Sequence, residues 1–294
     1  MNHMEALREA FERYRRKRFD AEKNRWEEDE PALPKNPVLE AMEYATEGGK
    51  RVRPLLLLLS YEACSVQTFI PEYVFDFAFA LECIHAYSLI HDDLPCMDDD
   101  DERRGRPSTH VAFGEWQALL AGDGLLNYAF SLLLQTAEEV EGSAHLPCVR
   151  AGRVLAQAAG LHGMLGGQVL DLSPQVLNES DVITRMVEKK TAALFRGACT
   201  AGALLAGMEP GDAALAKLDE YARCLGLAFQ AKDDLMDRMQ DEEEEKITLI
   251  SDWTEEEAQE RICALTERAA AQLTGLLHPQ MLIELAQQLV QRHH

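Results

Sequence analysis

Basic residues are scarce in this sequence. Its 29 lysines and arginines stand against 51 aspartates and glutamates, which gives a formal net charge of -22. Because so acidic a chain repels nucleic acid and anionic membrane surfaces, we expect neither as a partner. Long apolar runs are also missing: the longest aliphatic run, Leu55–Leu59, is far shorter than the roughly 20 residues that a membrane span needs. We therefore expect no stable membrane anchoring.

The cysteines form no recognisable framework. There are seven of them, an odd number, and they are scattered along the chain without a Cys-x-x-Cys pair. This pattern is typical of small core residues in a reducing compartment. The N-terminus is charged and lacks an apolar core, so we expect no signal peptide and a cytoplasmic protein.

Signals for a sheet are absent as well. Glycine (18) and proline (11) are few, and no segment alternates Val, Ile or Thr between Asn-Gly or Asp-Gly turns. Stretches rich in Ala, Leu, Glu and Gln favour helices instead. No internal repeat or linker is evident, so we expect residues 1–294 to form one all-α domain. The predicted helices cover residues 1–28, 38–47, 54–66, 71–94, 108–139, 144–169, 179–206, 210–241, 254–277 and 279–292.

The first chemical signal is a cluster of six carboxylates between Asp92 and Asp101. A solvated acidic loop is the ordinary interpretation of such a run. Here, however, the run follows directly on an apolar helix and is followed by Arg103 and Arg104. Because Pro95 disfavours helical geometry at the residue before it, the helix can end there. Asp98 can then fold back toward Asp92, and the two can share a cation.

A second acidic cluster lies about 140 positions later, at Asp233, Asp234 and Asp237. Asp233 and Asp237 are four residues apart and Gln230 precedes Asp233 by three, so all three share one helix face. Facing helices of one bundle can both contribute to a site. Carboxylate ligands from few residues suit Mg²⁺, which takes its remaining ligands from water and phosphate. Metal ions would also reverse the local charge and so allow a diphosphate to bind and leave.

Clusters of basic residues complete the pattern. The turn Gly48–Pro54 carries three cations in front of a helix N-terminus, where the dipole and free N–H groups favour anions. Arg103 and Arg104 follow the first acidic cluster, and arginine suits bidentate phosphate contacts. Lys189, Lys190 and Thr191 open another helical segment. Each basic group alone is more often a solvated surface charge. Together with the two acidic clusters, they imply a second diphosphate that binds without metals.

These motifs together resemble the trans-isoprenyl diphosphate synthases, and bacterial farnesyl diphosphate synthases in particular. The resemblance covers residues 38–237 in unbroken order. It implies the isoprenoid synthase fold, a large helical bundle with a central cavity between helices, and a homodimer. The segments that carry it are Gly48–Pro54, Glu82–His91 running into the first acidic cluster and Arg103-Arg104-Gly105, Gly166-Gly167-Gln168 with Asp171-Leu172, Lys190-Thr191, and Gly226–Gln230 running into the second cluster.

The resemblance also implies an activity, a short-chain synthase that condenses isopentenyl diphosphate with dimethylallyl or geranyl diphosphate to farnesyl diphosphate. The Mg²⁺ ions, three with diphosphate bound, are held by Asp92, Asp98 and Asp233. The allylic diphosphate is approached by Arg103, Lys190 and Lys232. Isopentenyl diphosphate is held by Gly49, Lys50, Arg53, His85 and Arg104. The allylic cation is stabilised by the Thr191 hydroxyl, the Gln230 side chain and the Lys190 carbonyl. Without the resemblance, His85 would be interpreted as a core histidine.

Product length has its own signal. Tyr87 precedes Asp92 by five residues, about 7.5 Å along a helix. With Ser88 beside it, its ring can form the floor of an apolar tunnel, and in the family an aromatic residue here accompanies a fifteen-carbon product. The simpler interpretation is a core aromatic. Geranylgeranyl or geranyl diphosphate synthesis stays open as an alternative. A class I terpene cyclase would not need the second diphosphate site.

The sequence departs from the family after Asp237. The connection there is about ten residues shorter than usual, and four consecutive glutamates stand where the family has a stretch with glycine and lysine. That stretch normally supplies a lysine to the metal-bound diphosphate. Lys246 can replace it from a shorter tether, with Thr248 after it, or closure of the site is impaired. The second case keeps open a catalytically impaired regulatory subunit, although such a subunit should have lost aspartates.

Overall fold

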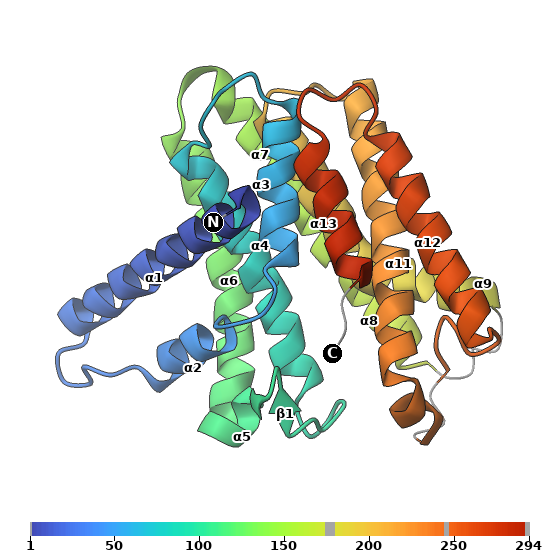
Figure 1. Cartoon of the computed structure of the whole chain (residues 1–294). Helices are drawn as coiled ribbons and strands as arrows, with labels where there is room; N and C mark the ends of the chain where they lie inside the picture. The colour runs from blue at the N-terminus through green and yellow to red at the C-terminus, as the bar shows by residue number, and fades with distance from the viewer. Residues whose placement is uncertain (1, 174–179, 244–246, 292–294) are drawn as a thin grey trace. The chain divides into compact units, whose positions relative to one another are not determined.

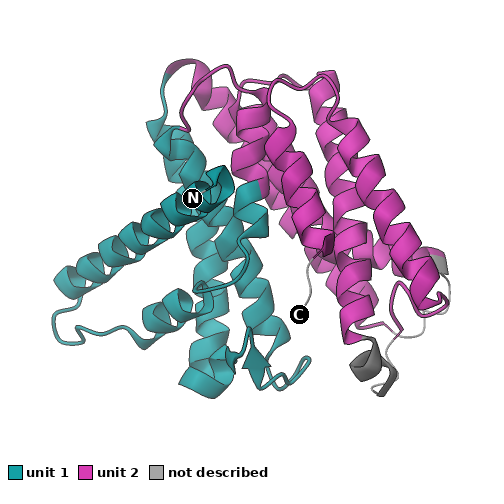
Figure 2. Ribbon diagram, in the orientation of Figure 1, with its two compact units in different colours: residues 1–55, 71–141 teal, residues 56–70, 142–294 magenta. Residues whose placement is uncertain are grey.

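The computed structural model describes residues 2–173, 180–243 and 247–291 (Figure 1). Contacts within the chain divide it into two compact units (Figure 2). Unit 1 contains Met1–Leu55 and Pro71–Glu141, and unit 2 contains Leu56–Ile70 and Gly142–His294. Helices dominate both units, so the all-α prediction is confirmed. The prediction of one domain stays a prediction.

Unit 1 is built around helix α4, whose apolar residues are almost completely buried. Helix α6 packs along α4, and the ring of Phe79 on α4 contacts Phe11 and Phe19 of helix α1. A capping box between Asn2 and Glu5 begins α1 and satisfies its first N–H groups. The elements are α1 (His3–Asp29), α2 (Pro37–Ala45), the first turn of α3 (Val52–Cys64), α4 (Glu72–Asp92), the strands β1 (Glu102–Arg103) and β2 (Arg106–Pro107), α5 (Thr109–Phe113) and α6 (Glu115–Glu139).

Unit 2 is centred on helix α10, which packs between α7 and α11. Helix α12 lies along α11, and a second capping box, between Thr254 and Glu257, begins α12. The elements are the rest of α3, the 3-10 turn η1 (Gly142–Ala144), α7 (His145–Ala159), α8 (Met164–Asp171), α9 (Ser180–Val187), the π-helical segment η3 (Glu188–Ala192), α10 (Ala193–Leu205), α11 (Ala213–Glu243), α12 (Glu255–Gln272) and α13 (Gln280–Gln291).

Three of the predicted helices are interrupted. The helix expected over 108–139 breaks at Gly114, whose φ of 105° lies in the left-handed region that favours glycine. The helix expected over 144–169 breaks between Gly160 and Gly163, and the one over 179–206 contains η3. The hairpin of β1 and β2, with Arg103 opposite Arg106, was not expected because each strand has only two residues.

Helix α4 is long and apolar enough, by composition alone, to cross a membrane. Its most apolar window has a mean hydropathy of 1.3, yet 67% of that window is buried inside the protein. A buried core helix of a soluble protein passes the same test. The hydropathy of α4 is therefore explained by its place in the core of unit 1.

Close contact between α3 and α10 gives a stability prediction. A Cβ atom at Gly202 would lie 2.2 Å from the carbonyl oxygen of Leu57, which is backbone and cannot move aside cheaply. We expect Gly202→Ala to destabilise the protein by about 1–3 kcal/mol through overpacking, measured by thermal unfolding. In Gly124→Ala, the matched control on α6, the new methyl meets only the flexible end of Met42. An unchanged melting temperature in Gly202→Ala would contradict the close packing.

Candidate active site

The turn between α2 and α3 has a fixed left-handed backbone. Gly48 and Gly49 have φ values of 69° and 82°. A Cβ atom on Gly49 would lie 2.7 Å from the guanidinium carbon of Arg104. Arg104 donates to the carbonyl oxygens of Glu47 and Gly48, at 3.2 Å each. Glycine is therefore needed both for the backbone and for the arginine, and Lys50 is exposed at the end of the turn.

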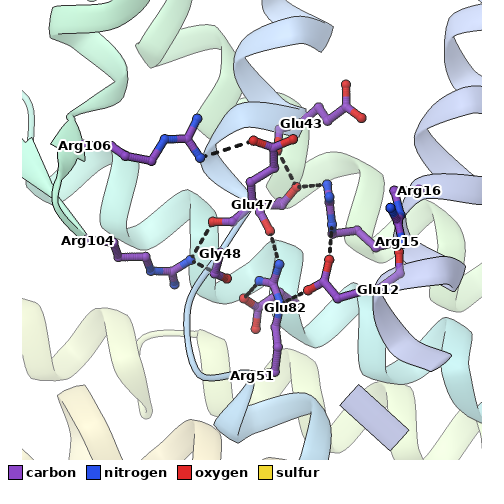
Figure 3. Close-up of polar contacts among 11 residues, drawn as sticks. Glu12, Arg15, Arg16, Glu43, Glu47, Gly48, Arg51, Glu82, Arg104 and Arg106 are labelled. Carbon is purple, nitrogen blue, oxygen red and sulfur yellow. Dashed lines mark hydrogen bonds and ion pairs between the residues drawn. The ribbon is translucent and has the colours of Figure 1, made fainter. Parts of the chain in front are cut away.

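Arg51 corrects the sequence interpretation of this turn. Three cations were expected to face an anion, but the side chain of Arg51 is only 1% exposed and is paired with Glu12 and Glu82 (Figure 3). Of the three cations, Lys50 and Arg53 therefore remain as candidates for contact with an anion. Periodicity could not show this, because the partners of Arg51 lie 39 and 31 residues away along the chain.

His85 accepts a hydrogen bond from Arg53 in the first turn of α3. The Nη1 atom of Arg53 lies 3.0 Å from Nε2 of His85. Arginine has only donors, so Nε2 is the acceptor and the proton of the neutral ring is on Nδ1. Burial and the nearby charge of Arg53 lower the pKa of His85 well below its usual value. His85 is therefore a neutral residue that orients Arg53.

The first acidic cluster folds back as predicted. Helix α4 ends at Asp92, and the backbone N–H of Asp98 donates to the carbonyl oxygen of Asp92 at 2.8 Å. Asp99 has a φ of 56°, so the chain turns sharply after Asp98. Asp92 is half-buried and Asp98 is exposed. Both predicted metal ligands of unit 1 therefore come from one tight turn at the end of a core helix.

Arg103 is held by carboxylates of the same cluster. It forms a short ion pair with Asp93, which is 2% exposed, and a second with Asp100 at 2.7 Å. Burial raises the pKa of Asp93, although the bonds from Arg103 oppose this shift. Asp93 is thus the structural counter-ion of Arg103. The hairpin of β1 and β2 carries Arg103 and Arg104 out of the cluster in a fixed geometry.

Tyr87 and Ser88 lie on α4 between His85 and Asp92. The ring of Tyr87 packs edge-on against His91 with centroids 5.9 Å apart, and burial raises the pKa of its hydroxyl. The Ser88 hydroxyl donates to the carbonyl oxygen of His85 at 2.8 Å. Tyr87 is half-buried. The residue is therefore not completely enclosed by the core.

In unit 2, one pocket brings most of the predicted residues together. It is lined by Lys190 and Thr191 of η3, by Gln230 and Asp233 of α11, and by Thr248 after α11. Asp171, Asp234 and Asp237 line it too. The predicted helix face of the second cluster is therefore observed. Lys232 instead lines a different groove, with residues of α12 and α13.

Two glycines of neighbouring helices lie against the π-helical segment η3. A Cβ on Gly167 of α8 would lie 2.2 Å from the backbone nitrogen of Lys190, and one on Gly226 of α11 would lie 2.5 Å from Cβ of Ala192. Both helices can therefore approach the η3 backbone closely. Single π turns inside helices are frequent at functional sites. Here the π turn places Lys190 and Thr191 on the pocket wall.

A chain of hydrogen bonds orders the pocket. The Thr191 hydroxyl donates to Oε1 of Gln230 at 2.8 Å, and Nε2 of Gln230 donates to Asp234 at 2.8 Å. Asp234 also accepts from the backbone N–H of Leu249 at 3.0 Å. Asp234 was not predicted as a site residue, and the only signal for it in the sequence is its place in the Asp-Asp-x-x-Asp motif.

Lys190 is paired with Asp171 of α8 at 2.5 Å, an ion pair in which both side chains are partly exposed. Asp171 belongs to a segment that carried the family resemblance, but no role had been assigned to it. This pair holds the lysine in the pocket without a ligand. Lys246, the proposed substitute for the missing loop lysine, lies outside the described residues.

The expected metal ligands are divided between the units, Asp92 and Asp98 in unit 1 and Asp233 in unit 2. Within the described residues, no three His, Cys, Asp or Glu side chains converge on one point. The donors present are carboxylates, which fit Mg²⁺ bound through water and phosphate oxygens.

Comparison with known proteins identifies the family. The family model described as polyprenyl synthetase matches residues 35–281. This chain belongs to the polyprenyl synthetase family. It is 48% identical to a farnesyl diphosphate synthase of Escherichia coli over 204 residues, which are 68% of this chain and 66% of that protein. The chain thus matches just under two thirds of that relative.

Two further proteins are similar to this chain and support the assignment to the polyprenyl synthetase family. The large subunit 1 of a heterodimeric geranylgeranyl pyrophosphate synthase from Arabidopsis thaliana is 43% identical over 208 residues, 68% of this chain and 54% of that protein. The crystal structure of an FPP/GFPP synthase from Zymomonas mobilis superposes with a TM-score of 0.79 and 34% identity, covering 98% of this chain and 99% of that one. The predicted family and isoprenoid synthase fold are confirmed.

The buried neutral histidine of this polyprenyl synthetase gives a pH prediction. Below about pH 6.5, the ordinary pKa of histidine, unfolded chains bind a proton at His85 that the folded protein does not bind. The free energy of unfolding should therefore fall as pH decreases from 7 to 5.5, with a His85 contribution approaching about 1.4 kcal/mol per pH unit. Urea unfolding at several pH values measures it. In His85→Gln this contribution should vanish, and parallel curves for the two proteins would contradict the assignment.

Proposed function

We propose that this protein condenses isopentenyl diphosphate with dimethylallyl or geranyl diphosphate and releases farnesyl diphosphate. The observation that carries the proposal is the unit 2 pocket, which gathers Lys190, Thr191 and Gln230 with the carboxylates of Asp233 and Asp237. A cation, two polar oxygens and a pair of metal-binding carboxylates are what ionisation of an allylic diphosphate needs. A pocket for a neutral ligand would not gather these charges.

In this mechanism the chain supplies charge and orientation. Lys190 approaches the departing diphosphate, and the oxygens of Thr191 and Gln230 stabilise the allylic cation as preorganised dipoles. The C1–O bond of the allylic diphosphate breaks, the double bond of isopentenyl diphosphate attacks C1, and the released diphosphate accepts the proton lost afterwards. Mg²⁺ supplies Lewis-acid stabilisation of the leaving diphosphate when bound. Three ions are proposed, held by Asp92, Asp98 and Asp233.

The second diphosphate is assigned to unit 1. Lys50, Arg53 and Arg104 would bind isopentenyl diphosphate directly, and His85 would orient Arg53. The exposure of Lys50 and the closeness of Arg104 to Gly49 support this assignment. Arg103 would approach the allylic diphosphate with the N–H groups that Asp93 and Asp100 leave free. Lys232 would approach the same diphosphate, although it lines the groove with α12 and α13.

A fifteen-carbon product is proposed over longer products. Tyr87 precedes Asp92 by five residues of α4, about 7.5 Å along the helix axis. Its partly exposed ring suits the floor of a tunnel with Ser88 beside it. The relationship to a geranylgeranyl synthase subunit keeps the longer product as the alternative.

A cytoplasmic homodimer is proposed as the working form. Four large apolar side chains are about half exposed or more on α6, at Trp116, Leu119, Leu120 and Leu134. Three of them, Trp116, Leu119 and Leu120, lie within five residues of one another, and exposed apolar patches are typical of protein interfaces. Light scattering coupled to gel filtration tests the proposal by mass.

The condensation assay tests the activity. The purified protein with Mg²⁺, isopentenyl diphosphate and geranyl diphosphate should form farnesyl diphosphate. We expect Asp98→Asn to lower kcat by about 100-fold or more, because the metal supplies several kcal/mol of transition-state stabilisation. Asp101→Asn, an exposed aspartate of the same cluster, is the matched control. Absence of any condensation product from the natural sequence would remove the proposed activity.

Product length tests the role of Tyr87. In Tyr87→Ala the floor of the tunnel is removed, so we expect products of twenty carbons or more, measured by chromatography of the dephosphorylated products. Tyr87→Phe keeps the ring and should still stop at fifteen carbons. An unchanged product from Tyr87→Ala would mean that Tyr87 is only a core aromatic.

A further inference from the structure

The guanidinium group of Arg51 is bonded on three sides by three different elements. Its Nε donates to Glu12 of α1, Nη1 donates to Glu82 of α4 at 2.6 Å, and Nη2 donates to the carbonyl oxygen of Thr46 at the end of α2 (Figure 3). The side chains of Arg51 and Glu82 are 1% and 3% exposed. A phosphate therefore cannot reach Arg51, although it lies between Lys50 and Arg53.

Glu12 extends the network toward α2. It also accepts from Arg15 at 3.0 Å, and Arg15 reaches the Thr46 hydroxyl at 3.4 Å. Burial alone would raise the pKa of Glu12, but the bonds and charges of Arg51 and Arg15 outweigh it and the pKa is lowered. For Arg51, burial disfavours the charge, but Glu82 and Glu12 outweigh it and raise the pKa. Both groups are therefore charged at neutral pH, so the network is an ion pair and not a set of neutral hydrogen bonds.

The network holds the backbone that carries the phosphate-binding cations. Arg51 has a φ of 56°, an uncommon value for a residue with a side chain, and its carbonyl oxygen accepts the first bond of α3 from Leu55. Lys50 precedes it and Arg53 follows by two. Three residues after Glu82 on α4, His85 bonds Arg53. One face of α4 thus fixes Arg51 and Arg53 together.

We propose that Glu12 and Glu82, acting through Arg51, are positioning residues that set the geometry of the isopentenyl diphosphate site formed by Lys50, Arg53 and Arg104. This rests on the proposed function. Glu12 lies on α1, outside residues 35–281 that the family model matches. The N-terminal helix therefore takes part in substrate binding without touching the substrate.

A purely structural role of the ion pairs would have a different effect on substrate binding than a positioning role. If the network only stabilised the fold, its loss would reduce the fraction of folded protein, and the molecules that remain folded would bind both substrates normally. A positioning role affects one substrate. Loss of Glu12 should weaken isopentenyl diphosphate binding while the KM for geranyl diphosphate stays the same, since the two substrates use different groups.

The experiment uses the full chain with Glu12→Gln, which keeps the shape and an acceptor oxygen but removes the charge. Glu9→Gln, one turn earlier on α1 and 58% exposed, is the matched control. Titration calorimetry with isopentenyl diphosphate in the presence of a metal chelator measures the Kd. We expect Glu12→Gln to raise the Kd about tenfold, since small misplacements of binding groups are costly, and Glu9→Gln to change it less than twofold. Glu82→Gln, tested below its melting temperature, should act in the same direction.

The possible results distinguish failure of the positioning role from failure of the proposed condensation activity. Unchanged Kd values in folded Glu12→Gln and Glu82→Gln would overturn the positioning role, as would no binding of isopentenyl diphosphate by the natural sequence. An equal rise in the KM for geranyl diphosphate would also overturn it, because the effect would then be general. If isopentenyl diphosphate binds as expected but no condensation occurs, the proposed function alone fails.

Discussion

Pairing between carboxylates and the functional cations is the interaction on which the rest of the site depends. In a chain with a net charge of -22, a cation attracts whichever carboxylate the fold brings near. Arg51 is held by Glu12 and Glu82, and Lys190 by Asp171. These two cases differ in burial. The side chains of Arg51 and Glu82 are almost inaccessible, and removing one partner of such a buried pair is strongly destabilising.

The Lys190–Asp171 pair is the opposite case. Its side chains are 29% and 23% exposed, and pairs in contact with water contribute little to stability. In the proposed function, a diphosphate would replace Asp171 as the partner of Lys190 at small cost. Burial thus distinguishes the enclosed Arg51 from the partly exposed Lys190. Arg103 combines both features, because its own side chain is 36% exposed while its partner Asp93 is buried.

Composition and local spacing were enough to predict the fold class and the shape of the first acidic cluster. The helical fold class follows from composition, and an end of α4 close to Pro95 follows from the restriction that proline places on the residue before it, so the fold class and the folded-back first cluster were predictable. The breaks near Gly114 and Gly163 were not, because a glycine inside a helical pattern is compatible with either continuation or a break. The π turn η3 could not be predicted either. Its backbone lies against Gly167 and Gly226, which are distant in sequence or on other helices.

In the candidate site too, features set by local spacing could be predicted, and features set by distant partners could not. Asp233, Asp237 and Gln230 share a face because of their spacing on one helix, and the pocket contains all three. Arg51 and Arg53 look equivalent in sequence, yet one is buried and the other lies by His85. Only partners distant in sequence distinguish them. Lys232, next to Asp233, faces another groove, since adjacent helical residues point about 100° apart.

The short connection after α11 is compatible with an ordered pocket because of Asp234. This residue, 7% exposed, accepts from Leu249 fifteen residues later and from the amide of Gln230. Since the nitrogen of Gln230 is used by Asp234, its oxygen faces Thr191. In the proposed mechanism, that polarity suits a developing cation. Leu249, in the segment that follows α11, therefore contacts the same carboxylate that orients Gln230.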